Sequence, residues 1–176
     1  MNALVVCESM FGNTEAIARA VGEGLSSQMG TEVVEVGAAP KAIGGNVGLL
    51  VVGGPTHAFG MSRPGTRQTA AQQAGPNLVS KGIGLREWLA GLRVESASAA
   101  AGTFDTRIFR PRVPGSAARA ATKRLRALGF REVAAAESFY VIGTDGPLLE
   151  GELDRARSWG EQLGSAVAEA KANLTT

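Results

Sequence analysis

Apolar runs alternate with helix-like segments along the whole chain. Five runs of mostly apolar residues are candidate strands: 3–7, 33–36, 48–52, 97–104 and 138–142. Helix-like segments lie between and after them: 14–27, 85–92, 114–128 and 147–167. Continuous apolar runs are typical of parallel strands that are covered on both faces. The pattern therefore predicts an α/β fold, a three-layer α/β/α sandwich around a five-stranded parallel sheet.

The segment that follows the third predicted strand breaks this pattern. Residues 60–84 contain few apolar side chains and many Gly, Pro, Gln and Arg residues. A connection of this length without secondary structure is uncommon in a compact domain unless it is a lid or a binding loop. We expect 60–84 to be such a segment, within a single domain that spans residues 1–176.

Composition narrows the possible functions. The chain has one Cys and one His, so it has no internal disulfide, and no metal site is expected. No apolar stretch is long enough to span a bilayer, and the first predicted strand begins too early to leave room for a signal peptide. We therefore expect a cytoplasmic protein without a membrane span.

A small polar loop connects the first predicted strand to the first predicted helix. Its residues are Ser9, Met10, Phe11, Gly12, Asn13 and Thr14. The first backbone N–H groups of a helix lack internal partners and carry the positive end of the helix dipole, so they bind anions. Gly12 lets the backbone approach a ligand closely. The alternative is an ordinary turn in which Asn13 merely caps the helix.

This loop resembles the phosphate-binding loop of the flavodoxin family, which binds FMN, except that Phe11 replaces the usual hydroxyl residue. Two later segments resemble the loops that contact the isoalloxazine ring in that family. The first is Pro55, Thr56, His57, Ala58, Phe59 and Gly60, and the second is Thr103, Phe104, Asp105 and Thr106. The resemblance implies strand order 2-1-3-4-5, with FMN bound at the carboxyl ends of the strands. It also implies electron transfer at the flavin, which requires no catalytic acid, base or nucleophile.

Several side chains compete for a role beside the ring. His57 could stack on the flavin, donate a hydrogen bond or, if protonated, stabilise the reduced anionic flavin; the alternative is a loop histidine without a role. Phe59 and Phe104 are both candidates for stacking. For the Asp105 side chain, a turn residue that bonds its own backbone is the favoured interpretation.

Positive charge is concentrated beside the third loop. Residues 103–131 contain eight Lys and Arg residues and one acid, in a chain whose net charge is +2. We expect Arg107, Arg110 and Arg112 to lie in a loop beside the ring, where they would attract a small anionic ligand or a redox partner. Nucleic acid is not expected, because aromatic residues do not interleave with these charges.

Three functions remain open at this point. The first is an FMN-dependent electron-transfer protein, although electron-carrying flavodoxins are typically strongly acidic. The second is a flavin or quinone reductase that uses NAD(P)H or another hydride donor. The third is a non-enzymatic module that binds a flavin or a deazaflavin.

Overall fold

The computed structural model describes residues 1–95 and 99–174. Its main sheet has five long parallel strands: β1 (Asn2–Cys7), β2 (Gly30–Glu35), β4 (Val47–Pro55), β6 (Ala100–Ile108) and β8 (Glu137–Val141). The spatial order is β2-β1-β4-β6, with β8 beside the end of β6 and the short β7 (Arg131–Glu132) beside its beginning. In chain order the five long strands thus follow 2-1-3-4-5, which confirms the predicted topology.

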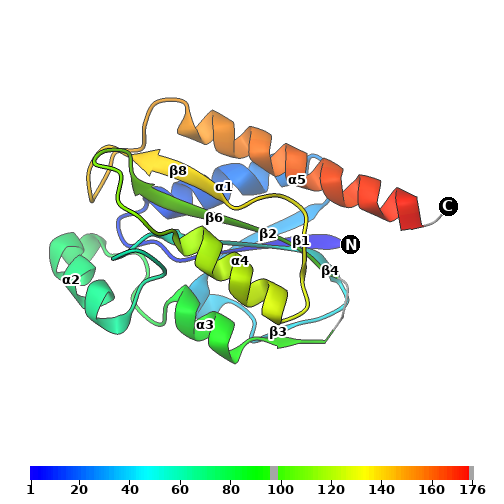
Figure 1. Cartoon of the computed structure of the whole chain (residues 1–176), viewed down its shortest axis with the longest axis horizontal. Helices are drawn as coiled ribbons and strands as arrows, with labels where there is room; N and C mark the ends of the chain where they lie inside the picture. Colours follow the sequence, from blue (N-terminus) through cyan, green and yellow to red (C-terminus); the bar gives the residue numbers. More distant parts are fainter. Residues whose placement is uncertain (96–98, 175–176) are drawn as a thin grey trace.

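Helices cover both faces of the sheet, as predicted for a three-layer sandwich (Figure 1). Helices α1 (Asn13–Ser26) and α5 (Glu152–Leu174) lie on one face, and α3 (Leu85–Gly91) and α4 (Ala117–Ala127) lie on the other. Each face has its own cluster of buried apolar side chains. Short elements complete the chain: η1 (Val36–Ala38), β3 (Ala42–Ile43), η2 (Gly75–Asn77) and β5 (Arg93–Val94). None of the helices in the described part of the chain is long and apolar enough to cross a membrane.

Two predicted helix starts are wrong by a few residues. Helix α4 begins after Ser116, whose hydroxyl caps it by accepting a hydrogen bond from the Arg119 N–H, and not at Pro114. Helix α5 begins at Glu152, because the chain at Pro147 still pairs with the end of β8. The predicted strand 97–104 is also displaced: residues 97 and 98 lie outside the described residues, and β6 continues to Ile108.

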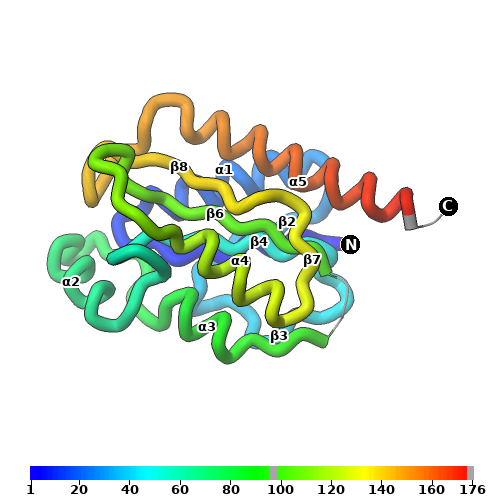
Figure 2. The backbone as a smooth tube through the Cα atoms, in the orientation of Figure 1, coloured from blue at the N-terminus to red at the C-terminus, as the bar shows by residue number. Residues whose placement is uncertain are grey.

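The expectation that 60–84 lacks regular structure is wrong. Helix α2 (Pro64–Ala74) and then η2 occupy it, at the end of the sheet where the strands terminate (Figure 2). Pro64 stands at the helix start, where its missing N–H costs nothing. Only Ala70 of α2 is buried, so the helix has no apolar stripe from which the sequence could reveal it.

Glycines allow α1 and α5 to pack at close range. A Cβ atom on Gly24 of α1 would lie 2.1 Å from the carbonyl oxygen of Arg157 in α5. A Cβ atom on Gly160 of α5 would lie 2.3 Å from the carbonyl oxygen of Val21. The two helices therefore touch through their backbones, and no larger residue fits at either position without moving them apart.

Replacing Gly24 by Ala should lower the free energy of unfolding by about 1 to 3 kcal/mol, because the added methyl group overpacks this contact. The matched control is Gly65→Ala in α2, where nothing lies within 4 Å of the added Cβ atom. Because Ala favours the helix, the control should be neutral or slightly stabilising. Urea denaturation measures both variants, and equal destabilisation would contradict the close-packing account.

Candidate functional site

A cavity of about 360 Å³ opens where the main strands end. Its walls come from the 9–14 loop after β1, from Pro55–Ala58 at the end of β4, and from Thr106–Ile108 at the end of β6. One face of α2 closes the cavity, together with Val141 at the end of β8 and Thr144 in the chain after it. In an open parallel sheet this edge is the expected position for a ligand.

The start of α1 lies in this cavity without a side-chain cap. Its N-cap residue is Gly12, which has φ 94° and no side chain to accept from the first turn. Asn13 does not cap the helix; its amide instead donates to the carbonyl oxygen of Asp145 at 3.0 Å. The hydroxyl oxygen of Ser9 accepts from the Gly12 N–H at 3.1 Å. The first-turn N–H groups of α1 are therefore available to an anion.

The predicted residues separate into those that line the cavity and those that do not. From the first loop, Ser9, Met10, Phe11, Asn13 and Thr14 line it, while Gly12 supplies the turn. From the second and third segments, the residues that line it are Pro55, Thr56, His57, Ala58 and Thr106. Thr14 and Thr106 join two of these segments through a hydrogen bond of 2.7 Å between their hydroxyl groups.

Residues 103 and 104 lie in a strand as predicted, but the expectation that the strand ends before Asp105 is wrong, because β6 continues to Ile108. Thr103 is buried and bonds the Thr122 hydroxyl at 2.6 Å. Phe104 is buried in the core, with its ring centroid 6.0 Å from that of Phe139 and 6.1 Å from that of Trp159. Phe104 therefore cannot stack on a ligand in the cavity.

Asp105 has a structural role that differs from the expected turn. Its buried carboxylate accepts from the hydroxyl groups of Thr56 at 3.0 Å, Ser116 at 2.5 Å and Ser138 at 2.7 Å. It also accepts from the backbone N–H of Ala118 at 3.1 Å. Asp105 thus ties together the end of β4, the start of α4 and β8, behind the cavity wall.

Phe59 projects outward from a tight turn. The backbones of His57 and Gly60 bond each other at 2.8 and 3.0 Å, and the two residues between them have positive φ, 42° for Ala58 and 77° for Phe59. The Phe59 side chain is 60% exposed and does not line the cavity. Gly60 closes the turn and also lies outside the cavity wall.

His57 lines the cavity and is held by α2. Its Nδ1 lies 3.2 Å from the Thr66 hydroxyl, which donates its own hydrogen to the carbonyl oxygen of Arg63 at 3.1 Å. A proton on Nδ1 satisfies both contacts of this hydroxyl, and with this tautomer Nε2 is an acceptor. Burial, with a smaller contribution from Arg67, lowers the pKa of His57 below its ordinary value of 6.5. A protonated, anion-stabilising His57 is therefore not favoured.

Helix α2 contributes four cavity residues that sequence reasoning missed: Thr66, Thr69, Ala70 and Gln73. They recur at helical spacing and form one face of the helix. The signals that could have revealed them are Pro64 at a helix start and small or polar residues every three or four positions.

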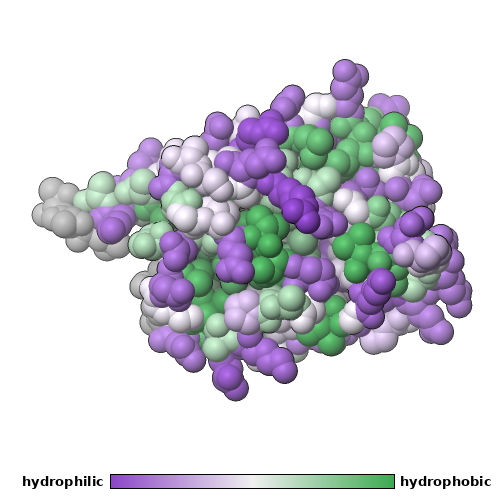
Figure 3. All heavy atoms as spheres, turned by 180° about the vertical axis from the view of Figure 1, so that it is seen from behind, coloured by the Kyte–Doolittle hydropathy of each residue, from purple (hydrophilic) through white to green (hydrophobic). Residues whose placement is uncertain are grey.

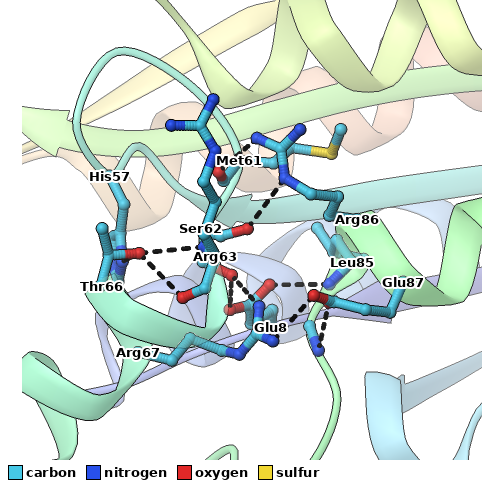
Figure 4. A network of polar contacts seen from close by, with 11 residues as sticks. Glu8, His57, Met61, Ser62, Arg63, Thr66, Arg67, Leu85, Arg86 and Glu87 are labelled. Atoms are coloured by element: carbon cyan, nitrogen blue, oxygen red, sulfur yellow. Dashed lines mark hydrogen bonds and ion pairs between the residues drawn. The ribbon is translucent and has the colours of Figure 1, made fainter.

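A buried network fastens the segment that carries α2 to the end of β1 (Figure 4). The carboxylate of Glu8 accepts from the Ser62 hydroxyl and, at 2.8 Å, from the Leu85 N–H. Arg67 donates to Ser62 and to Glu87, each at 2.9 Å. Burial raises the pKa of Glu8, although the Ser62 hydrogen bond opposes this shift.

A pair of serines extends the same attachment. The Ser9 N–H donates to the Ser80 hydroxyl at 3.0 Å, and the Ser80 N–H donates to the Ser9 carbonyl oxygen at 2.8 Å. Segment 60–84 is therefore anchored directly beside the 9–14 loop.

The three arginines expected beside the ring differ in their positions. Arg107 belongs to β6 and not to a loop; it lines the cavity and donates to the carbonyl oxygen of Val113. Arg110 and Arg112 are exposed in the connection between β6 and α4. Arg110 lies over the ring of Phe109, 5.3 Å from its centroid.

Comparisons with known proteins support the fold. No protein-family model and no curated protein sequence matches this chain. Among solved structures, a flavodoxin from the domain Archaea matches with TM-score 0.63 and 16% identity, covering 96% of this chain and 99% of the other. Flavodoxin 1 from Bacillus cereus matches with TM-score 0.66 and 13% identity, covering 94% and 98%. A flavodiiron core from Synechocystis matches with TM-score 0.60 and 17% identity, covering 97% of this chain and 36% of that one.

These structural neighbours confirm the expected resemblance at the level of the fold. The chain has a flavodoxin-like α/β fold, and its neighbours are flavodoxins and flavodiiron proteins. Since the identities lie between 13% and 17%, the comparisons establish architecture, and the ligand must be argued from the cavity.

NMR of the imidazole ring should find His57 neutral at pH 7 and protonated at Nδ1, with its pKa below 6.5. The unfolded chain then binds this proton at higher pH than the folded chain does. The free energy of unfolding should therefore decrease as the pH falls from about 6.5 toward the folded-state pKa. Because the chain has one histidine, the signals need no assignment. A pKa at or above 6.5 would contradict the described environment.

Glu8→Gln should remove a pH dependence of the free energy of unfolding whose sign is opposite to the one expected for His57. Because the pKa of Glu8 is raised in the folded chain, ionisation of its carboxyl costs stability as the pH rises from about 4.5 through the folded-state pKa. The variant keeps an acceptor for the Leu85 N–H but cannot ionise. Its free energy of unfolding relative to the parent should therefore increase across this range. A difference that is independent of pH in urea denaturation would show that Glu8 is not desolvated.

Proposed function

We propose that this protein binds FMN and transfers electrons. The observation that carries the proposal is the uncapped N-terminus of α1, which opens into a cavity at the carboxyl ends of the strands. An anion gains there the free N–H groups and the positive end of the helix dipole. A ligand with a phosphate at one end and a flat apolar group at the other matches this arrangement.

The remaining cavity walls suit an isoalloxazine ring. Pro55, Ala58, Ile108 and Val141 supply apolar surface, and the Thr and Gln side chains of α2 supply polar contacts. A cavity of about 360 Å³ lies within the range of small-molecule sites. His57 would accept a hydrogen bond from a ring N–H through Nε2, and α2 would exclude water from one side. When bound, FMN would supply the one- and two-electron chemistry.

A second hollow favours FMN over a deazaflavin with an anionic tail. It has a volume of about 450 Å³ and shares Phe11, Gln73 and Thr144 with the cavity. Its other lining residues are Ala74, Asn77 and Asp145, so it offers a carboxylate and no cation. An anionic extension beyond the phosphate would meet repulsion there. Of the three arginines expected to attract such a tail, Arg107 lines the cavity and donates to the Val113 carbonyl oxygen, whereas Arg110 and Arg112 line neither hollow.

A reductase that takes hydride from NAD(P)H remains the second candidate. It would use the same flavin site, together with space for a nicotinamide against the ring. Mixing the FMN-loaded protein with NADH or NADPH without oxygen distinguishes the two, because only a reductase bleaches the flavin absorbance at a catalytic rate.

Asn13→Asp should weaken FMN binding at least about tenfold, because it places a carboxylate among the first-turn N–H groups. Riboflavin, which lacks the phosphate, should bind equally to the variant and the parent. The control is Asn46→Asp, an exposed position before β4 at the opposite end of the sheet. Fluorescence titration measures all three proteins. Equal losses for FMN and riboflavin would indicate structural damage and contradict a phosphate site at this helix.

A further inference from the structure

We propose that an acidic protein docks on a surface beside the cavity made of Phe59, Val113, Arg63, Arg112 and Arg119. We name this surface the docking face. The inference rests on the proposed electron-transfer function, since it identifies the chemistry of the redox partner. The residues of the docking face all belong to this chain, and none of them is part of the proposed flavin.

The apolar centre of the docking face is held outward at a conformational cost. Phe59 is 60% exposed and Val113 is 42% exposed. Phe59 has φ 77°, and its neighbour Ala58 has φ 42°, in a turn whose two central positions ordinarily favour Asn and Gly. A residue with a Cβ atom is destabilised in such a conformation. Phe59 is therefore kept largely exposed in a turn that its residue type does not favour, which points to a contact outside the chain.

Two separate segments form one continuous face. A Cβ atom on Gly115 would lie 2.0 Å from the carbonyl oxygen of Phe59, so the 57–60 turn and the β6–α4 connection touch through their backbones. Gly115 has φ 89°, which a larger residue would rarely adopt. The Thr56 hydroxyl also accepts from the Ala117 N–H at 3.0 Å. Phe59 and Val113 therefore extend from a rigidly joined platform.

The acid that touches this platform, Asp105, is buried and bonded on its inner side, so the exposed charges of the two segments are arginines. Segments 56–69 and 106–119 together contain six arginines and no acidic residue. With these six removed from the net charge of +2, the rest of the chain carries −4. The exposed arginines of these segments attract and orient an acidic partner as it approaches.

Three of these arginines are free to pair with a partner. Arg63, Arg112 and Arg119 are exposed, and none of them has an ion-pair partner within residues 1–95 and 99–174. In Figure 4 the Arg63 side chain extends away from the Glu8 network.

Seen from behind the view of Figure 1, the surface of the molecule is mixed, with apolar patches separated by hydrophilic side chains (Figure 3).

Exposed apolar side chains on the same segments as unpaired arginines match an acidic protein better than other anions. A small anion needs only the charges and gains nothing from Phe59 and Val113. Nucleic acid would need phosphate contacts along a longer track, and the unpaired arginines here lie on two short segments that also carry the exposed apolar side chains. Arginine at an interface also gives bidentate contacts to carboxylates, which fix orientation.

The test uses an acidic [2Fe–2S] ferredoxin as the probe, added to the ¹⁵N-labelled protein at low salt, both with and without FMN. Amide shifts should concentrate in 57–60 and 109–119, and raising the salt should weaken binding. The triple variant R63Q/R112Q/R119Q should bind at least tenfold more weakly. The matched triple variant K41Q/R93Q/R131Q changes the same net charge at exposed positions and should bind like the parent.

Phe59→Asn separates docking from folding. Because Asn tolerates positive φ, the variant should be as stable as the parent or more stable, yet bind the ferredoxin several-fold more weakly. Three results would overturn the proposal: unchanged binding by this variant, equal loss in both triple variants, or no binding at low salt. A DNA duplex that competes with the ferredoxin at equal charge concentration would overturn it as well. Because ferredoxin binding is also measured without FMN, its result can be interpreted even if the protein does not bind FMN.

Discussion

The arrangement of the cavity depends on one buried carboxylate. Asp105 accepts hydrogen bonds from three hydroxyl groups and one backbone N–H, which come from the end of β4, the start of α4 and β8. A buried carboxylate is tolerated only when such donors satisfy its oxygens, so these segments are held at fixed positions around it. Thr106, the next residue, then faces the cavity and bonds Thr14 of α1. The two binding segments are thereby set against each other.

The anchored α2 segment gives the cavity its second wall. Glu8 and Ser9, at the end of β1, bind Ser62 and Ser80 of this segment and Leu85 at the start of α3. The 9–14 loop and the segment that covers the cavity thus share one attachment point. Because α2 has almost no apolar face of its own, polar contacts of this kind hold it in position.

Much of the fold follows from the sequence, because covered parallel strands leave continuous apolar runs and the loop at 9–14 has a local physical signature. The errors arose where distant partners decide the structure. Asp105 is polar and so indicates a loop, but four donors from remote segments keep it within a strand. Helix α2 lacks periodic apolar residues, and the direction of Phe59 depends on a turn that its residue types do not favour.

The first turn of α1 is the proposed binding site for the phosphate of a flavin. The ¹H–¹⁵N spectrum of the protein, titrated with FMN and separately with riboflavin, tests this site most directly. FMN should strongly shift the amide signals of residues 13–15, whereas riboflavin should bind more weakly and leave them almost unchanged. Equal binding of the two ligands, or FMN shifts that bypass these amides, would contradict it.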